Sequence, residues 1–134
     1  MIKNVVIADD SALARMFIRR CLEIAGLGDV NFIEASDGRE AIACMKKAKA
    51  DLLVTDLTMP NMNGIELMRK ISSSPRLSGT PVLVVTSAGN EEQRKELMEL
   101  GATRILSKPI SPPILIDALQ EVDRLLGGTG DEEE

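Results

Sequence analysis

The sequence contains no histidine, no tryptophan and no tyrosine, and phenylalanine, present twice, is its only aromatic residue type. Many proteins that hold single-stranded nucleic acids stack the bases on aromatic side chains, so the composition argues against that class. A zinc site built on histidine is excluded by the same absence. Hydrophobic residues nevertheless make up 44% of the chain, so its core must be aliphatic, built from leucine, isoleucine, valine, alanine and methionine.

Cysteine is almost as rare, with only Cys21 and Cys44 in 134 residues. Both lie at apolar positions of expected helices and do not have the spacing of paired metal ligands, so we expect two small buried hydrophobic side chains and no zinc. The N-terminus lacks the pattern of a signal peptide, and no apolar run is long enough to span a membrane. We therefore expect a cytoplasmic protein that does not insert into membranes.

Charge is limited as well: the formal net charge is -5, and four negative charges lie in the last four residues, Asp131 to Glu134. The rest of the chain is close to neutral and has no basic stripe, which argues against direct binding to nucleic acid. The acidic end follows a glycine-rich segment, 127–130. We expect one domain over residues 1–126, followed at 127–134 by a disordered tail or the linker stub of a larger protein.

The hydrophobic period alternates between that of a strand and that of a helix along the chain. Strands are predicted at Asn4–Ala8, Val30–Ala35, Leu52–Thr55, Val82–Thr86 and Arg104–Leu106. Helices are predicted at Ser11–Ala25, Gly38–Ala48, Gly64–Ser73, Glu91–Leu100 and Pro112–Leu126. Alternation of five strands with five helices indicates an α/β protein, a three-layer αβα sandwich in which helices cover both faces of a parallel, doubly wound sheet.

Polar side chains follow four of the predicted strands, at the edge where such sheets bind ligands. They are Asp9 and Asp10 after the first strand, Asp56 after the third, Thr86 at the end of the fourth and Lys108 after the fifth. Taken singly, each has an ordinary structural explanation, such as a helix cap, a turn or a solvated lysine. Together, three carboxylates repel one another unless a cation offsets them, and oxygen ligands of this kind suit Mg²⁺ with a phosphate. The sequence thus favours a magnesium and phosphoryl site.

The same residues stand in four short motifs that occur in a fixed order. These are VVIADD at Val5–Asp10, D-x-x-M-P-x-x-x-G at Asp56–Gly64, Thr86-Ser87 and Lys108-Pro109. The spacings are 46 positions from Asp10 to Asp56, 30 from Asp56 to Thr86 and 22 from Thr86 to Lys108. Between about residues 2 and 126 the chain resembles the response-regulator receiver family, which implies a flavodoxin-like sheet with strand order 2-1-3-4-5.

The resemblance implies a phosphorylation site. Asp56 resembles the phospho-acceptor, Asp9 and Asp10 the acidic pair that binds Mg²⁺, and the backbone carbonyl of Thr58 a further metal ligand. Lys108 resembles the lysine that contacts the phosphoryl group. The implied donor is a phosphohistidine on a sensor histidine kinase or a phosphotransfer protein. The donor histidine must come from elsewhere, because this chain has none.

The resemblance also implies a switch. Thr86 resembles the hydroxyl that turns toward the phosphoryl group, and the Lys108-Pro109 peptide is expected to be cis. The output surface is expected on the fourth helix, the fifth strand and the fifth helix, chiefly 91–100 and 103–106. Many receivers carry an aromatic residue where this chain has Ile105, and Ile110 replaces a common phenylalanine. Coupling by a swinging aromatic ring is therefore not expected here.

Four methionines invite a partner-binding interpretation, because methionine surfaces adapt to different partners. We expect instead that Met68 and Met98 lie in the core and that Met59 packs the turn after Asp56. Met62 is left open.

Two other functions compete with phosphorylation signalling. Phosphatases resembling the haloacid dehalogenase group carry D-x-D at the nucleophile, whereas Thr58 stands at the second position here. We therefore expect self-phosphorylation and autodephosphorylation only, and no turnover enzyme. A phosphorylation-independent interaction module usually lacks one of the acidic residues or the lysine, and all are present. A stand-alone regulator and a fragment of a longer regulator or hybrid kinase both remain open.

Overall fold

The computed structural model describes residues 2–87 and 90–127 of the chain. The strands are β1 (Asn4–Ala8), β2 (Asn31–Ala35), β3 (Leu52–Asp56), β4 (Val82–Thr86) and β5 (Arg104–Ser107). The helices are α1 (Ala12–Leu22), α2 (Gly38–Lys47), α3 (Gly64–Ser72), α4 (Glu91–Glu99) and α5 (Pro112–Leu125), with a π-helical segment η1 (Glu23–Leu27) after α1. The tail predicted at 127–134 lies outside the described residues except for Gly127.

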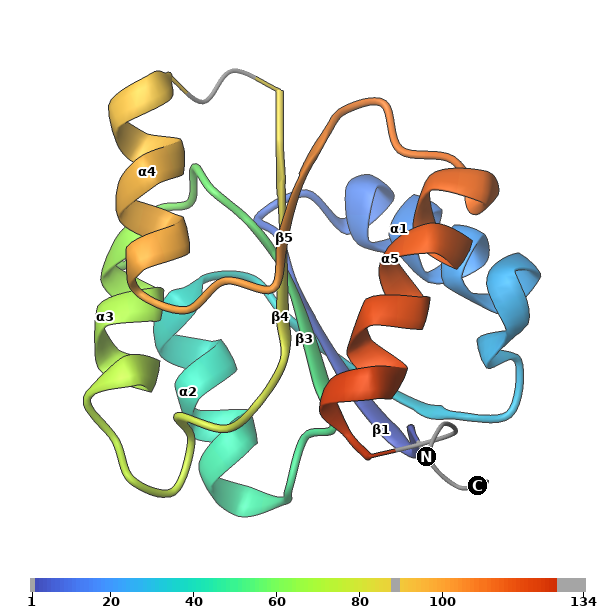
Figure 1. Cartoon of the computed structure of the whole chain (residues 1–134), viewed down its shortest axis with the longest axis horizontal. Helices are drawn as coiled ribbons and strands as arrows, with labels where there is room; N and C mark the ends of the chain where they lie inside the picture. The colour runs from blue at the N-terminus through green and yellow to red at the C-terminus, as the bar shows by residue number, and fades with distance from the viewer. Residues whose placement is uncertain (1, 88–89, 128–134) are drawn as a thin grey trace.

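All five strands are parallel and lie in the order β2-β1-β3-β4-β5, which confirms the expected sheet. Helices α1 and α5 cover one face, and α2, α3 and α4 cover the other (Figure 1). None of the described helices has the length and apolar character needed to cross a membrane.

Both faces of the sheet are buried, and successive residues of a strand alternate between them. Val6, Leu53 and Val84 pack in the core beneath α2, α3 and α4. Their neighbours along the strands, such as Val5 and Val54, pack in the second core beneath α1 and α5. The central strands are therefore continuous apolar runs, which is why the sequence marked them so clearly.

The first helix differs from its prediction. The α-helix ends at Leu22, and the chain continues through η1, within which Gly26 has a φ of 120°. Few residues other than glycine adopt this conformation, so the regular helix cannot continue through the segment.

Helix α4 also differs from expectation, because Met98 is 51% exposed and the prediction that it lies in the core was wrong. Leu97 is the buried residue of this helix. Adjacent residues lie about 100° apart around a helix, so Met98 cannot share the inward direction of Leu97. The other methionine predictions are confirmed, with Met68 and Met59 buried, while Met62 is partly buried against the same core.

The two cysteines do not form a disulfide, and they differ in burial. Cys21 is buried as expected, whereas Cys44 is only partly buried at the edge of the core beneath α2. The first is thus an ordinary core residue, and the second is an intermediate case that the helical pattern did not distinguish.

Candidate functional site

Three carboxylates meet where β1 and β3 end. The two strands pair in parallel with Ala8 opposite Thr55, so the residues that follow them emerge side by side. Each of Asp9, Asp10 and Asp56 offers a carboxylate oxygen, and these oxygens lie within 4.8 Å of one another. Asp9 is 1% exposed and Asp56 9% exposed, whereas Asp10 faces solvent. The predicted acidic cluster is therefore assembled by the sheet itself.

Lys108 brings a positive charge to this cluster from the other side of β4. Its backbone N–H donates to the carbonyl of Thr86 at 2.9 Å, which holds the residue at the end of β5. The side-chain Nζ lies 3.5 Å from Asp9 Oδ2 and 3.6 Å from Asp56 Oδ1. The following peptide, Lys108-Pro109, is cis as the resemblance implied. One lysine thus faces two buried carboxylates.

The charge on Asp56 is only partly compensated. Burial raises the pKa of Asp56 above its usual range, and the nearby Asp9 raises it further. Lys108 and the backbone N–H groups of Leu57 and Thr58 act in the opposite direction, with Leu57 donating to Asp56 Oδ1 at 2.8 Å. A raised pKa means that the ionised form lacks sufficient stabilisation. A small divalent cation with a preference for oxygen, such as Mg²⁺, fits this set of ligands.

The loop after Asp56 is fixed by close backbone packing at Gly64. The Gly64 N–H donates to the carbonyl of Leu57 at 2.8 Å. A Cβ atom at Gly64 would lie 2.8 Å from the Asp56 carbonyl oxygen and 2.9 Å from the Leu57 Cα. Both atoms belong to the backbone, so neither can move aside without moving the loop. The glycine that closes the D-x-x-M-P-x-x-x-G motif is thus required by the position of Asp56.

A second attachment of this loop was not anticipated from the sequence. Asn61, with a φ of 63°, donates from Nδ2 to Asp37 Oδ2 at 2.7 Å, and Asp37 also caps α2 by accepting from the Glu40 N–H. The Asn61 hydrogen bond is the main cause that lowers the pKa of Asp37, followed by that of Glu40. Gly38 meanwhile donates to the carbonyl of Met62 at 3.1 Å. In the sequence, Asp37-Gly38 before a helical pattern predicts the cap of α2, but it does not predict the contact with the loop at Asn61 and Met62.

Two of the three predicted switch residues, Thr86 and Pro109, lie near the strand ends that carry the acidic cluster and Lys108. Thr86 is 4% exposed at the end of β4 and is opposite Ser107 of β5 in the sheet register. Ile105 is partly buried against the core beneath α4. Thr58 is exposed on the loop just beyond Asp56, and Pro109 is exposed beyond Lys108. The structure therefore places Thr58, Thr86 and Pro109 near the ends of β3, β4 and β5, whereas Ile105 lies further back in β5, opposite Val84.

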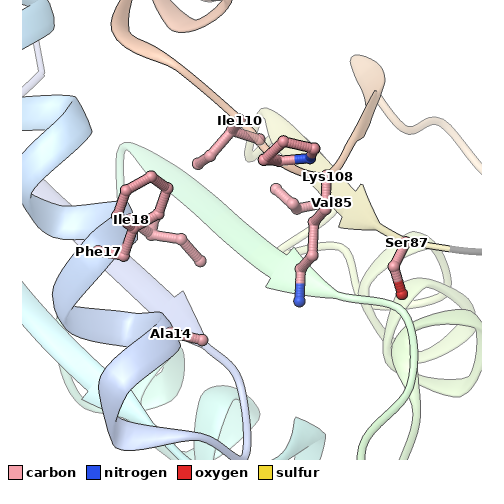
Figure 2. Close-up of a pocket in the computed structure, with 8 residues that line it drawn as sticks. Ala14, Phe17, Ile18, Val85, Ser87, Lys108 and Ile110 are labelled. Atoms are coloured by element: carbon pink, nitrogen blue, oxygen red, sulfur yellow. The ribbon is translucent and has the colours of Figure 1, made fainter.

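An apolar recess of about 450 Å³ adjoins Lys108, between α1 and the start of the segment that leads to α5 (Figure 2). Its lining consists of Ala14, Phe17, Ile18, Val85, Ser87, Lys108, Pro109 and Ile110. Phe17 is 51% exposed, and Leu13 and Met16 on the same helix are exposed more strongly still. Sequence reasoning missed this surface, because a helical pattern does not reveal which apolar residues the sheet leaves uncovered.

Comparison with known proteins gives a consistent result. Residues 5–120 match the family model described as the response regulator receiver domain. The chemotaxis protein CheY of Pseudomonas aeruginosa is 32% identical, with 93% of this chain and 99% of that protein covered. The phosphate regulon transcriptional regulatory protein PhoB of the same organism is 34% identical over 98% of this chain, but this covers only 56% of PhoB.

Solved structures agree with the sequence relatives. The chemotaxis response regulator CheY4 of Vibrio cholerae has 33% sequence identity and a TM-score of 0.78, covering 91% of this chain and 99% of that one. The signal receiver domain of a signal transduction histidine kinase from Syntrophus aciditrophicus has 27% identity and a TM-score of 0.78, covering 98% and 96%. Similar domains thus occur both in CheY-type proteins and in a histidine kinase.

Proposed function

Because this chain belongs to the response regulator receiver family of two-component signalling, we propose that it accepts a phosphoryl group on Asp56 and in response switches a surface for partner binding. The observation that carries this proposal is the position of Asp56: it is nearly buried, lies beside Asp9 and Asp10, and is 3.6 Å from the Lys108 ammonium. These are the groups that phosphoryl transfer requires for positioning and charge stabilisation.

Asp9, Asp10 and Asp56 would hold Mg²⁺, together with the backbone carbonyl of Thr58. When bound, the ion supplies positive charge that offsets the carboxylates and the phosphoryl oxygens. The raised pKa of Asp56 supports this assignment, since the carboxylate needs more positive charge than Lys108 alone provides. Asp10, which is exposed, leaves the cluster open on its solvent side.

The chain's own residues would carry the transfer as follows. An Asp56 carboxylate oxygen forms a bond to phosphorus while the bond from phosphorus to the donor's imidazole nitrogen breaks, and the electron pair of that bond remains on the imidazole. Lys108 neutralises charge on the phosphoryl oxygens, and the Thr86 hydroxyl donates a hydrogen bond to one of them. The loop after Asp56 is already fixed at Gly64, so little reorganisation is needed when the donor arrives.

The donor is proposed to be a histidine kinase or a phosphotransfer protein. The sequence has no histidine, so a phosphohistidine must be supplied from outside these 134 residues. The exposed side chains of Leu13, Met16 and Phe17 offer an apolar surface beside the site on which such a protein can dock. We expect this encounter in the cytoplasm, without a direct contact to nucleic acid.

The output surface is proposed on α4, β5 and α5. Exposed apolar side chains lie on both helices of this surface, with Met98 on α4 and Ile114 and Ile116 on α5. Phosphorylation adds nearly two negative charges beside Thr86, and movement of its hydroxyl would allow α4 and β5 to repack. Ile105, partly buried beneath α4, would follow this movement by repacking rather than by an aromatic rotation.

The alternative function is a phosphorylation-independent interaction module of the same fold, either alone or as part of a longer protein. The matched segment of PhoB shows that a domain of this kind can make up 56% of a larger regulator. The complete acidic cluster and Lys108 favour the phosphorylation proposal. We also propose that the protein is not a turnover enzyme, and it should therefore release no phosphate from phosphorylated metabolites.

The decisive experiment is the intact mass of the protein after incubation with acetyl phosphate and Mg²⁺, beside an Asp56→Asn variant. We expect a gain of one phosphoryl group in the parent, no gain in the variant, and no gain when Mg²⁺ is chelated. No gain in the parent at any Mg²⁺ concentration would favour the interaction module. A gain of equal size in the Asp56→Asn variant would show that another residue is the acceptor.

A further inference from the structure

Arg15 on α1 makes two hydrogen bonds that connect the metal site to the edge of the sheet. Its Nη1 donates to the backbone carbonyl of Asp9 at 2.5 Å, and its Nε donates to Glu34 Oε1 at 2.7 Å. Its side chain is 16% exposed, whereas those of Arg19 and Arg20 on the same helix are 47% and 75% exposed. Arg15 is thus held between the end of β1 and β2 and is less exposed than Arg19 and Arg20, which both pair with Glu23 on the surface.

The carbonyl that Arg15 binds belongs to the peptide that joins Asp9 to Asp10. At this point β1 leaves the sheet: the Asp9 N–H still donates to the carbonyl of Ala35, and β2 ends at that residue. The Asp9 side chain accepts from the Ser11 N–H at 2.9 Å, which begins the turn into α1. The orientation of the Asp9-Asp10 peptide sets the directions of both carboxylates. Arg15 restrains this orientation because it donates a hydrogen bond to the carbonyl oxygen of that peptide.

Glu34 explains how an arginine can stand so close to a cation site. An uncompensated guanidinium beside Asp9 would oppose the binding of Mg²⁺, because like charges repel. Glu34 lies opposite Ile7 in the register of β1 and β2, and its carboxylate accepts from Arg15. The pair is neutral overall. A planar guanidinium can donate to both partners at once, which a lysine ammonium on its flexible stem does less well.

We propose that Arg15 is a positioning residue for the metal site, with Glu34 as the partner that orients it and offsets its charge. This inference rests on the proposed function, because it assumes that Asp9, Asp10 and Asp56 bind Mg²⁺. Residues that orient metal ligands commonly change the affinity about 10–100-fold when they are replaced. Arg15 touches neither the metal ligands' carboxylates nor the phosphoryl group in this role; it acts through the Asp9 carbonyl.

The test is a titration of ¹⁵N-labelled protein with MgCl₂, followed by the amide resonances of residues 9–11 and 56–58. Arg15→Ala should weaken Mg²⁺ binding about tenfold, and Arg15→Lys should restore part of the loss. Arg20→Ala is the matched control, since it removes an exposed arginine from the same helix, and its affinity should stay within a factor of two. Without Mg²⁺, the amide resonance of Asp10 should shift in Arg15→Ala and not in Arg20→Ala.

Labelling by acetyl phosphate separates positioning from a general structural role. The Mg²⁺ concentration that gives half-maximal labelling should rise in Arg15→Ala, while the rate at saturating Mg²⁺ should approach that of the parent. Urea unfolding followed by circular dichroism checks the fold. Should Arg15→Ala fail to fold, Glu34→Gln takes its place, with weaker Mg²⁺ binding expected for the same reasons.

The outcomes distinguish this inference from the function on which it rests. If the parent neither binds Mg²⁺ nor is labelled, both are overturned. If the parent does both, and folded Arg15→Ala and Glu34→Gln bind Mg²⁺ as tightly as Arg20→Ala, the positioning role is wrong and the proposed function stands. A loss of labelling rate at saturating Mg²⁺ with unchanged affinity would also overturn it.

Discussion

The edge of the sheet at which the strands end carries Asp56 on one side and Lys108 on the other, and these two sides are built differently. On the side of β1 and β3, the loop that follows Asp56 is attached at Gly64 by backbone packing and at Asn61 by a hydrogen bond to Asp37. On the side of β4 and β5, helix α4 buries Leu97 alone among its residues. The capping residue Leu100 is only partly buried against the same core, and the side-chain hydrogen bonds of α4 to neighbouring elements are exposed.

Those polar attachments of α4 are an ion pair between Arg69 of α3 and Glu96, and a hydrogen bond of 3.1 Å from Arg94 to Ser107. Exposed ion pairs contribute little to stability, typically about 0–1 kcal/mol. The comparison indicates that the groups of the proposed phosphorylation site are fixed in advance, whereas the element expected to respond is held weakly. Elements that move in signalling are drawn from the less stable parts of a fold.

Two matched leucine truncations test this comparison, and we expect the largest change in stability from them. Leu67 of α3 and Leu97 of α4 are both fully buried. Leu67→Ala should lower the free energy of unfolding of the whole domain by about 3 kcal/mol, as is usual for a buried leucine. Leu97→Ala should instead release α4 alone, because Leu97 is the buried anchor of that helix.

Hydrogen exchange measured by mass spectrometry checks the difference. In Leu97→Ala, faster exchange should be confined mainly to 91–99, and labelling of Asp56 should persist. A uniform loss of protection across the domain in Leu97→Ala, like that in Leu67→Ala, would mean that α4 is as firmly integrated as α3.

A smaller effect is expected from adding one methyl group at Gly64. Its Cβ would meet the backbone of Asp56 and Leu57 at 2.8 and 2.9 Å, so the loop must shift. Gly64→Ala should therefore cost about 2 kcal/mol of unfolding free energy and slow the labelling of Asp56. This direction is opposite to the usual gain from replacing a glycine within a helix.

Gly79→Ala is the control, since a Cβ there meets nothing within 4 Å. Its unfolding free energy should stay within about 0.5 kcal/mol of the parent. Chemical denaturation gives both values. If Gly64→Ala proved as stable and as readily labelled as Gly79→Ala, the loop after Asp56 could not be described as rigid.

The same contrast explains what could be predicted from the sequence. Buried parallel strands are continuous apolar runs, so β1, β3 and β4 were located almost to the residue. The strand ends then converge by topology alone, which brought Asp9, Asp56 and Lys108 together without any knowledge of side-chain positions.

Contacts between loops were not predictable in this way. Asn61 and Asp37 are 24 residues apart, and neither lies within a periodic pattern. The bond from Arg15 to the Asp9 carbonyl depends on the rotation of α1 about its axis, which the sequence leaves undetermined. The prediction for Met98 was wrong for a related reason: the rotation of α4 about its axis directs only Leu97 into the core.

The smallest expected effect is the pH dependence of stability, which should differ in sign between the carboxylates of Asp56 and Asp37. Burial raises the pKa of Asp56, so the native state binds a proton that the unfolded state has lost. Stability in the absence of Mg²⁺ should therefore fall as pH rises from the ordinary value of 3.8 through the raised value, and the penalty is complete above it. Asp56→Asn should be more stable than the parent at pH 7, with an advantage that shrinks on acidification.

Asp37 should show the opposite sign, because hydrogen bonds from Asn61 and Glu40 lower its pKa. Its stabilisation is present above its ordinary value of 3.8 and is lost as pH falls through the lowered value. Asp37→Asn should therefore be less stable than the parent at pH 7, and this difference should shrink in acid. Urea unfolding without Mg²⁺, from pH 7 down to pH 3, measures both variants. If Asp56→Asn were no more stable than the parent at pH 7, the ionised Asp56 carboxylate would not destabilise the fold, and the site would hold no uncompensated charge for a cation to relieve. If Asp37→Asn were as stable as the parent, the hydrogen bonds from Asn61 and Glu40 would not stabilise the loop.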